Sequence, residues 1–141
     1  MRRRGIRSCT TMLALLIIAC GGAEVATEPV VTSVAGTWNL TSVNGKSLPF
    51  TFQAADPREE LLAKKYVITA AGTYSYSYSV RATDDDGQVT LSNGSDSGTE
   101  SLSNTIVTFR SGSDGSTLTA VVSGTTMTIV SGDYSQLFTK Q

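Results

Sequence analysis

The sequence predicts an all-β domain, an antiparallel up-and-down β-barrel of eight to nine strands with one short helix near residues 57–64. Three observations support this fold class. The 141 residues suit a single domain. From residue 36 onward, short runs of aromatic and β-branched residues alternate with Ser and Thr, and turn residues separate the runs. Curling the first strand onto the last buries the apolar face and removes both sheet edges. A two-sheet β-sandwich is the second possibility.

The strands follow one another at regular intervals. The first, residues 36–43, places Trp38 and Leu40 on one face, and Asn44-Gly45 then predicts a type I′ hairpin turn. Further strands are expected at residues 47–53, 65–71, 73–82 and 88–92. After a loop at residues 93–98, the remaining strands are expected at 99–103, 105–111, 117–123, 125–131 and 134–140. Connections of two to five residues favour an antiparallel meander.

The helix is predicted from the segment Asp56-Pro57-Arg58-Glu59. Asp56 suits an N-cap, Pro57 the first helical position, and Glu59 the third position of a capping-box-like pair. Two turns of helix are marginal alone, so Leu61 or Leu62 would have to pack on the sheet.

The N-terminus predicts export and a lipid anchor. Four arginines within the first seven residues precede an apolar core at residues 12–19, which is too short to cross a bilayer but suits a signal peptide. The core ends in Ile17-Ile18-Ala19-Cys20, which resembles the lipobox of bacterial lipoproteins. That resemblance implies a signal peptide at residues 1–19 and lipidation of Cys20. Residues 20–35 are then a flexible tether to a domain at residues 36–141.

The predicted location is the cell envelope, with the membrane as a partner through the lipid. Several acyl chains on Cys20 would give stable attachment. Gly21 after the cysteine is similar to the sorting signal for the periplasmic face of the outer membrane in hosts that have one. Removal of the arginine-rich leader leaves an acidic chain, which argues against nucleic acid as a partner. No motif in the sequence specifies a protein partner.

The first strand resembles the opening of lipocalin-like domains of bacterial lipoproteins. Residues 36–45 fit the pattern G-x-W-x-L-x-S-V-N-G, and the stretches 71–74, 96–99 and 104–109 fit the same family. The opening is also similar, more weakly, to META-type lipoproteins. The resemblance implies that Trp38 closes the barrel floor beneath a basic side chain from a late strand, either Lys140 or Arg110.

Tyr74, Tyr76 and Tyr78 form a period-two stripe, and three interpretations of it stay open. The tyrosines pack in the core, line a ligand pocket with their polar tips, or face outward to contact a partner. The pocket interpretation makes them the candidate ligand-binding residues.

Composition argues against catalysis and against cofactors. The chain has no His, so histidine-based triads and imidazole metal sites are excluded. No phosphate loop or metal-ligand spacing occurs. Asp84-Asp85-Asp86-Gly87 lacks the alternation of a calcium loop and is interpreted as a turn. We therefore expect a non-enzymatic envelope lipoprotein whose barrel binds a small apolar or amphipathic ligand. The alternative is a structural or protein-interaction module with a fully packed interior.

Overall fold

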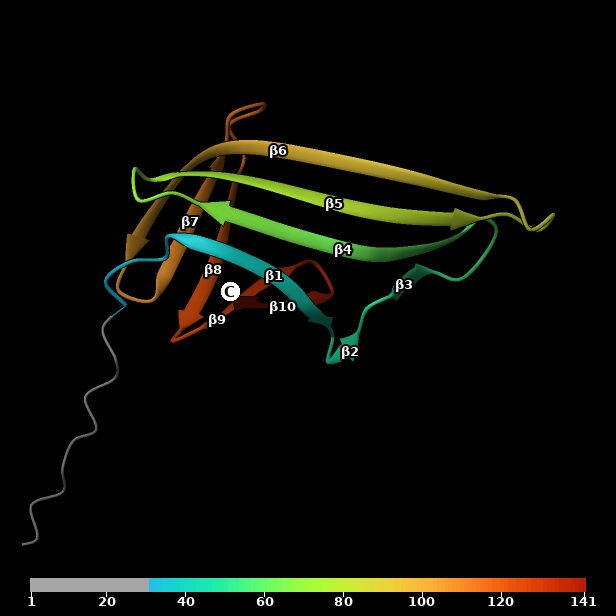
Figure 1. Ribbon diagram of the computed structural model, residues 1–141, viewed down its shortest axis with the longest axis horizontal. Helices are drawn as coiled ribbons and strands as arrows, with labels where there is room; N and C mark the ends of the chain where they lie inside the picture. The colour runs from blue at the N-terminus through green and yellow to red at the C-terminus, as the bar shows by residue number, and fades with distance from the viewer. Residues whose placement is uncertain (1–30) are drawn as a thin grey trace, which may run out of the picture.

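The computed structural model describes residues 31–141, and this part of the chain is entirely β-structure without helix. Ten strands form one antiparallel sheet that closes on itself (Figure 1). The strands are β1 (Gly36–Val43), β2 (Lys46–Ser47), β3 (Phe50–Gln53), β4 (Arg58–Ile68), β5 (Thr73–Thr83), β6 (Val89–Ser103), β7 (Ile106–Ser111), β8 (Thr117–Ser123), β9 (Thr126–Ser131) and β10 (Tyr134–Lys140).

The barrel closes through β1, which pairs with β10 on one side and with β4 on the other. Between them the strands follow chain order from β4 to β10, each paired with its neighbour. The barrel prediction is therefore confirmed, and the sandwich alternative is wrong. The β1–β2 turn has the positive φ angles of a type I′ turn, 50° at Asn44 and 74° at Gly45.

Three strands extend well beyond the barrel. β4 and β5 have 11 residues each and β6 has 15, but β1 pairs only with the last part of β4, and β7 only with Gly98–Ser103 of β6. The remaining lengths project from the barrel as a continuation of the same sheet, with β3 added along β4 (Figure 1). We call this projection the wing; it comprises residues 50–53, 58–64, 77–83 and 89–96.

The helix predicted at residues 57–64 is wrong, because this segment is the first part of β4. Arg58 to Leu61 pair with β5, and Glu59 to Leu61 also pair with β3. Glu60 and Leu61 point to opposite faces, and Glu60 is buried between two arginines. Pairing with a strand on each side satisfies the backbone hydrogen bonds of this segment, and it is more stable than a marginal two-turn helix. The Asp56 carboxylate accepts a hydrogen bond from the backbone N–H of Asp85 rather than capping a helix.

The loop predicted at residues 93–98 is also wrong, because these residues are the middle of β6. Its two glycines serve close packing instead of a turn. A Cβ atom on Gly98 would lie 1.9 Å from the carbonyl oxygen of Arg110, and one on Gly94 would lie 2.2 Å from the Tyr78 ring. Glycine is therefore required at position 98, where a backbone oxygen occupies the side-chain position, whereas at position 94 that place is taken by the Tyr78 ring.

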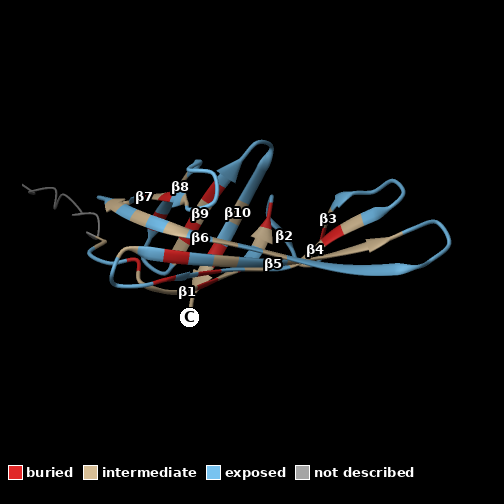
Figure 2. Ribbon diagram, turned by 90° about the horizontal axis from the view of Figure 1, so that it is seen from above, coloured by how far each residue is buried: buried red, intermediate tan, exposed pale blue. Residues whose placement is uncertain are grey.

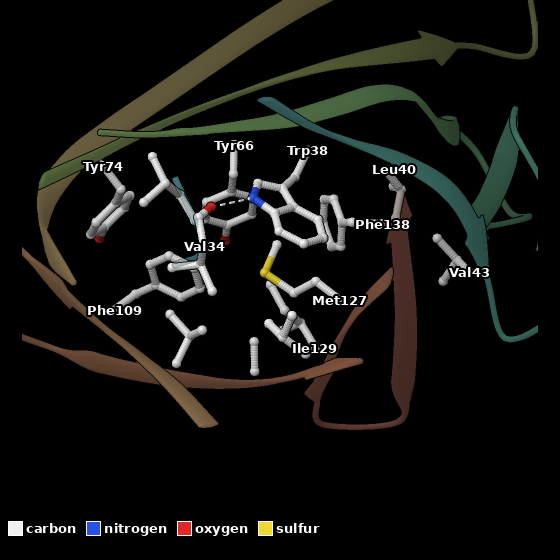
Figure 3. Packing of buried hydrophobic residues seen from close by; sticks show 14 of the residues in the cluster. Val34, Trp38, Leu40, Val43, Tyr66, Tyr74, Phe109, Met127, Ile129 and Phe138 are labelled. Carbon is white, nitrogen blue, oxygen red and sulfur yellow. Dashed lines mark hydrogen bonds between the residues drawn. The ribbon is translucent and has the colours of Figure 1, made fainter. Parts of the chain in front are cut away.

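The core lies inside the barrel, and the wing is largely exposed (Figure 2). The largest fully buried side chains include Trp38, Tyr66, Phe109, Phe138 and Met127 (Figure 3). Alternate residues of the barrel strands supply these side chains, as the period-two pattern predicts.

One end of the barrel is plugged by the segment before β1. Val34 is buried, Val31 packs against the core, and the Trp38 indole N–H donates a hydrogen bond of 2.8 Å to the Val34 carbonyl (Figure 3). Packing thus begins before residue 36. The predicted signal peptide, Cys20 and most of the tether lie outside the described residues.

Candidate functional site

The three candidate tyrosines of β5 lie on one face at three depths. Tyr74 is buried, Tyr76 is half-buried against the core, and Tyr78 is 37 % exposed and lies over Gly94 in the wing. The stripe thus leads from the barrel interior, past the open end, onto the wing. Tyr74 and Tyr76 line one cavity at the open end of the barrel, and Tyr78 lines a hollow beside the wing.

Tyr66 of β4 forms an aromatic floor beneath the open end. Its ring centroid lies 4.9 Å from Phe109, 5.2 Å from Tyr76 and 5.3 Å from Phe138, with Tyr74 at 6.1 Å. Aromatic pairs at these separations each add stability beyond the area they bury. Below this floor the barrel is filled with side chains.

Above the floor is a cavity of about 230 Å³, which we call the cup. Aromatic rings form its base, and its rim is mainly polar. The rim is formed by Lys64, Asp96, Ser111, Ser116, Leu118 and Ser131, contributed by β4, β6, β7, β8, β9 and the β7–β8 loop. An aromatic base with a polar rim is a typical lining for a small-molecule site.

Lys64 is the principal charged group of the cup. Its ammonium donates a hydrogen bond of 3.1 Å to Gln136 Oε1, and it lies 5.4 Å from the Tyr76 ring centroid and 5.7 Å from that of Tyr66. Within residues 31–141, no carboxylate lies within 4.0 Å of this ammonium. Burial lowers the pKa of Lys64 from its usual 10.5. An ammonium that has lost water without gaining a counterion favours an anionic ligand group.

Asp96 lies on the same rim and has a neutral partner. Its carboxylate accepts a hydrogen bond of 2.7 Å from the Ser111 hydroxyl. Burial, and secondarily the charge of Asp96, raise the pKa values of Tyr74 and Tyr76 above 10.0. Both phenols are therefore neutral at physiological pH and retain an O–H donor for a ligand.

Trp38 lies at the opposite end of the barrel from the cup. Its side chain is fully buried, and Lys140 Nζ lies 5.4 Å from the ring centroid. Of the two basic side chains expected near this ring, Lys140 and Arg110, it is Lys140 that lies over it. Trp38 lines neither the cup nor either of the two outer hollows.

Two wider hollows lie on the outside of the sheet. One, of about 680 Å³, occurs where β1 parts from β4, and another, of about 580 Å³, lies over the outer face of β4, β5 and β6. Both are more open than the cup. Serines and Lys65 form much of their lining. Each of them has a single aromatic side chain in its lining, Tyr78 in the larger and Tyr76 in the smaller, whereas four aromatic rings line the cup. The cup is therefore the better candidate site.

Sequence reasoning found two of the cup's residues, Tyr74 and Tyr76, and missed Lys64 and Asp96. Lys64 was assigned to a helix and Asp96 to a loop, so neither was expected to share a face with the tyrosines. The alternation Lys64, Tyr66, Ile68 is a period-two signal that places the lysine on the inner face.

Comparison with protein-family models, with curated proteins and with solved structures found no match to this chain. Among residues 31–141 there is no group of three His, Cys, Asp or Glu side chains placed to hold a metal ion. The same part of the chain contains no helix long and apolar enough to span a membrane.

Proposed function

We propose that this chain is a non-catalytic lipoprotein of the bacterial envelope whose barrel binds a small amphipathic molecule in the cup. The observation that carries the binding proposal is Lys64, a half-buried ammonium placed over two tyrosine rings with a neutral amide as its hydrogen-bonding partner. The lipobox at residues 17–20 supports the envelope location.

The lining selects the ligand class. An anionic group would pair with Lys64, and an apolar or flat part would pack on Tyr76 and the aromatic floor. A volume of about 230 Å³ equals roughly seven to eight water molecules, below the range of drug-sized pockets. The ligand is therefore small, or inserts only one end. A purely apolar ligand would leave the ammonium buried without compensation, so the amphipathic class is preferred.

The binding proposal is tested with the amphipathic aryl sulfonate 8-anilinonaphthalene-1-sulfonate and variants of two adjacent lysines. Lys64 faces the cup and also borders the larger outer hollow, whereas Lys65 is exposed, lines both outer hollows and does not line the cup. Fluorescence titration should give a dissociation constant about 10 to 100 times larger for Lys64→Met, because a charge-assisted hydrogen bond contributes about 1.5–3 kcal/mol. Lys65→Met should bind like the parent protein. Equal weakening in both variants, or in neither, would contradict the proposal.

The envelope location is tested separately with Cys20→Ser. The variant should lose the lipid and leave the membrane fraction as a soluble or uncleaved precursor. Retention in membranes after a carbonate wash would disprove the lipobox interpretation while leaving the cup untouched.

A second candidate function, protein interaction, is favoured by the wing. The interior below the cup is filled by aromatic and aliphatic side chains, and of the hydrophobic wing residues only Phe50 and Leu61 belong to or pack against that core. A sheet that projects into solvent offers a surface rather than a cavity.

A further inference from the structure

The wing leaves one long sheet edge open. β6 pairs with β5 without interruption from Thr99 back to Val89, but with β7 only from Gly98 onward. Residues 89–96 of β6 therefore have a strand on one side only, and Figure 1 shows this part of β6 at the margin of the sheet. Eight residues of strand correspond to about 27 Å of unpaired backbone.

The alternation along β6 shows which of its backbone N–H and C=O groups face the open side. The Ser97 carbonyl accepts a hydrogen bond from Gly112 on the β7 side, while the Glu100 N–H donates to Gly72 on the β5 side. Odd-numbered residues of β6 thus direct their backbone groups away from β5. Val89, Leu91, Asn93 and Ser95 therefore present N–H and C=O groups at the open side.

The edge carries none of the features that usually block strand addition. Residues 89–95 contain no charged residue and no proline, and the β5–β6 register has no bulge. Val89 is 58 % exposed and Leu91 is 65 % exposed. The opposite margin of the wing, formed by β3, is less suited to strand addition, because β3 has only four residues and its pairing with β4 contains a register shift. Unprotected edges of this length are templates for an added strand.

Acidic groups bound the open edge at both ends. Asp84, Asp85 and Asp86 form the turn before β6, and Asp96 and Asp114 lie at the barrel end. Hydrogen bonds from Ser116 lower the pKa of Asp114, so this carboxylate is ionised at neutral pH.

These charges argue against a second copy as the occupant. Antiparallel pairing of β6 with itself would bring the aspartate turn of one copy beside Asp96 and Asp114 of the other. Arg110, at the end of β7, and the two lysines that line hollows together with Asp96, Lys64 and Lys65, give three positive charges against five carboxylates, so the balance stays negative. Like charges brought together in this way oppose association.

We propose that residues 89–95 of β6 accept an extended strand from a basic partner protein. The added strand would pair with the odd-numbered backbone groups, place apolar side chains beside Val89 and Leu91, and carry lysine or arginine near each end to meet the aspartates. This inference rests on the second candidate function and not on the cup. Backbone pairing supplies the affinity, and the flanking charges select the partner.

The test uses the purified full-length chain and an acetylated eight-residue probe peptide of alternating Val and Thr with a Lys at each end. Binding should slow amide hydrogen exchange at Val89, Leu91 and Asn93, the donors on the open side. A peptide with Glu in place of each Lys should bind at least ten times more weakly. A Lys peptide N-methylated on the residues that pair with the edge should not bind.

Two variants at one position separate backbone pairing from side-chain contact. Leu91→Pro removes an outward N–H, and should abolish binding, whereas Leu91→Thr keeps that N–H and should bind within a few-fold of the parent. The N-methylated peptide decides the question if the proline variant does not fold. Unchanged exchange at Val89 and Leu91 with bound peptide, or equal binding of the methylated peptide, would overturn the proposal. So would loss of peptide binding in Lys64→Met alone, because the peptide would then occupy the cup.

Sedimentation of the chain alone tests whether a second copy of the chain occupies the open edge. We expect a monomer at micromolar concentration. A dimer that Leu91→Pro dissociates would identify a second copy at the edge and overturn the assignment to a basic partner. If no peptide bound, the proposed protein interaction would be disproved, whereas the proposal of sulfonate binding at Lys64 would be unaffected.

Discussion

The two ends of the barrel use the same pair of groups, a lysine over aromatic rings, with different results. At the plugged end Lys140 covers Trp38, whose indole is fully buried and whose N–H is satisfied by Val34. At the open end Lys64 lies over Tyr66 and Tyr76 beside a cavity of about 230 Å³. The plugged pair is therefore structural. The open pair retains the unfilled space and the uncompensated charge that a ligand requires.

The largest effect is expected from removing the plug. Trp38→Ala should lower the free energy of unfolding by about 3–5 kcal/mol, because the site is fully buried and enclosed. Tyr76→Ala at the open end should cost only about 1–2 kcal/mol, because this side chain is only partly buried and borders the cup. Urea denaturation measures both. Equal losses would mean that Tyr76 is as enclosed as Trp38 and that the cup is part of the core.

Trp38→Phe refines the same measurement. Phe keeps an aromatic ring but leaves the Val34 carbonyl without its donor, which should cost about 1–3 kcal/mol. A cost as large as that of Trp38→Ala would assign the whole effect to the hydrogen bond rather than to packing.

The second prediction concerns the point where β6 leaves the barrel. Gly98→Ala should destabilise the protein by about 1–3 kcal/mol, because the new methyl group meets the backbone carbonyl of Arg110, which cannot move without breaking the β6–β7 pairing. Gly94→Ala meets only the Tyr78 ring, which is partly exposed and can rotate away. Thermal unfolding of both variants should rank Gly98 well above Gly94; the reverse order would place the rigid contact in the wing.

Much of the barrel was predictable because its signals are local. The Asn44-Gly45 turn and the alternating strands from β7 to β10 were recognised within a residue or two. The errors occurred where a distant partner decides the structure. Residues 57–64 satisfy the local rules for a helix start, yet pairing with β3 and β5 makes them a strand.

The cup was harder to predict for the same reason. Tyr74 and Tyr76 were recognised from the stripe of β5. Lys64 and Asp96 come from β4 and β6, and only the strand register brings them onto the face of the tyrosines. Gly94 and Gly98 predict a turn locally, although the groups that occupy their side-chain positions come from Tyr78 and Arg110, which are distant in sequence.

The third prediction is alkaline unfolding controlled by the floor of the cup. Burial raises the pKa of Tyr66 above its usual 10.0. Below pH 10 the phenol is neutral in both the folded and the unfolded chain, so its contribution to the free energy of unfolding is fully present. Above pH 10 the unfolded chain ionises first, so the free energy of unfolding falls by at most about 1.4 kcal/mol per pH unit from this group. Tyr74 and Tyr76 act in the same direction, whereas the lowered pKa of Lys64 acts oppositely just below pH 10.5.

Tyr66→Phe should make the alkaline fall shallower while keeping the ring contacts. Urea denaturation between pH 8 and pH 11.5 measures the slope in both proteins. An identical slope in the variant would show that Tyr66 ionises as readily in the folded chain as in the unfolded one.

The smallest effect, and the most direct test of the comparison, comes from the two lysines. Lys140→Met should cost about 0.5–1 kcal/mol, the contribution of a cation over an aromatic ring near the surface. Lys64→Met should leave stability unchanged or raise it slightly, because the same attraction at the cup is offset by the desolvation that lowers the pKa of Lys64. Sulfonate binding should follow the opposite order, weakened by Lys64→Met and unaffected by Lys140→Met. If Lys64→Met destabilised the fold as much as Lys140→Met, its ammonium would be a structural cap like that of Lys140, and the open end would have no charge left to offer a ligand.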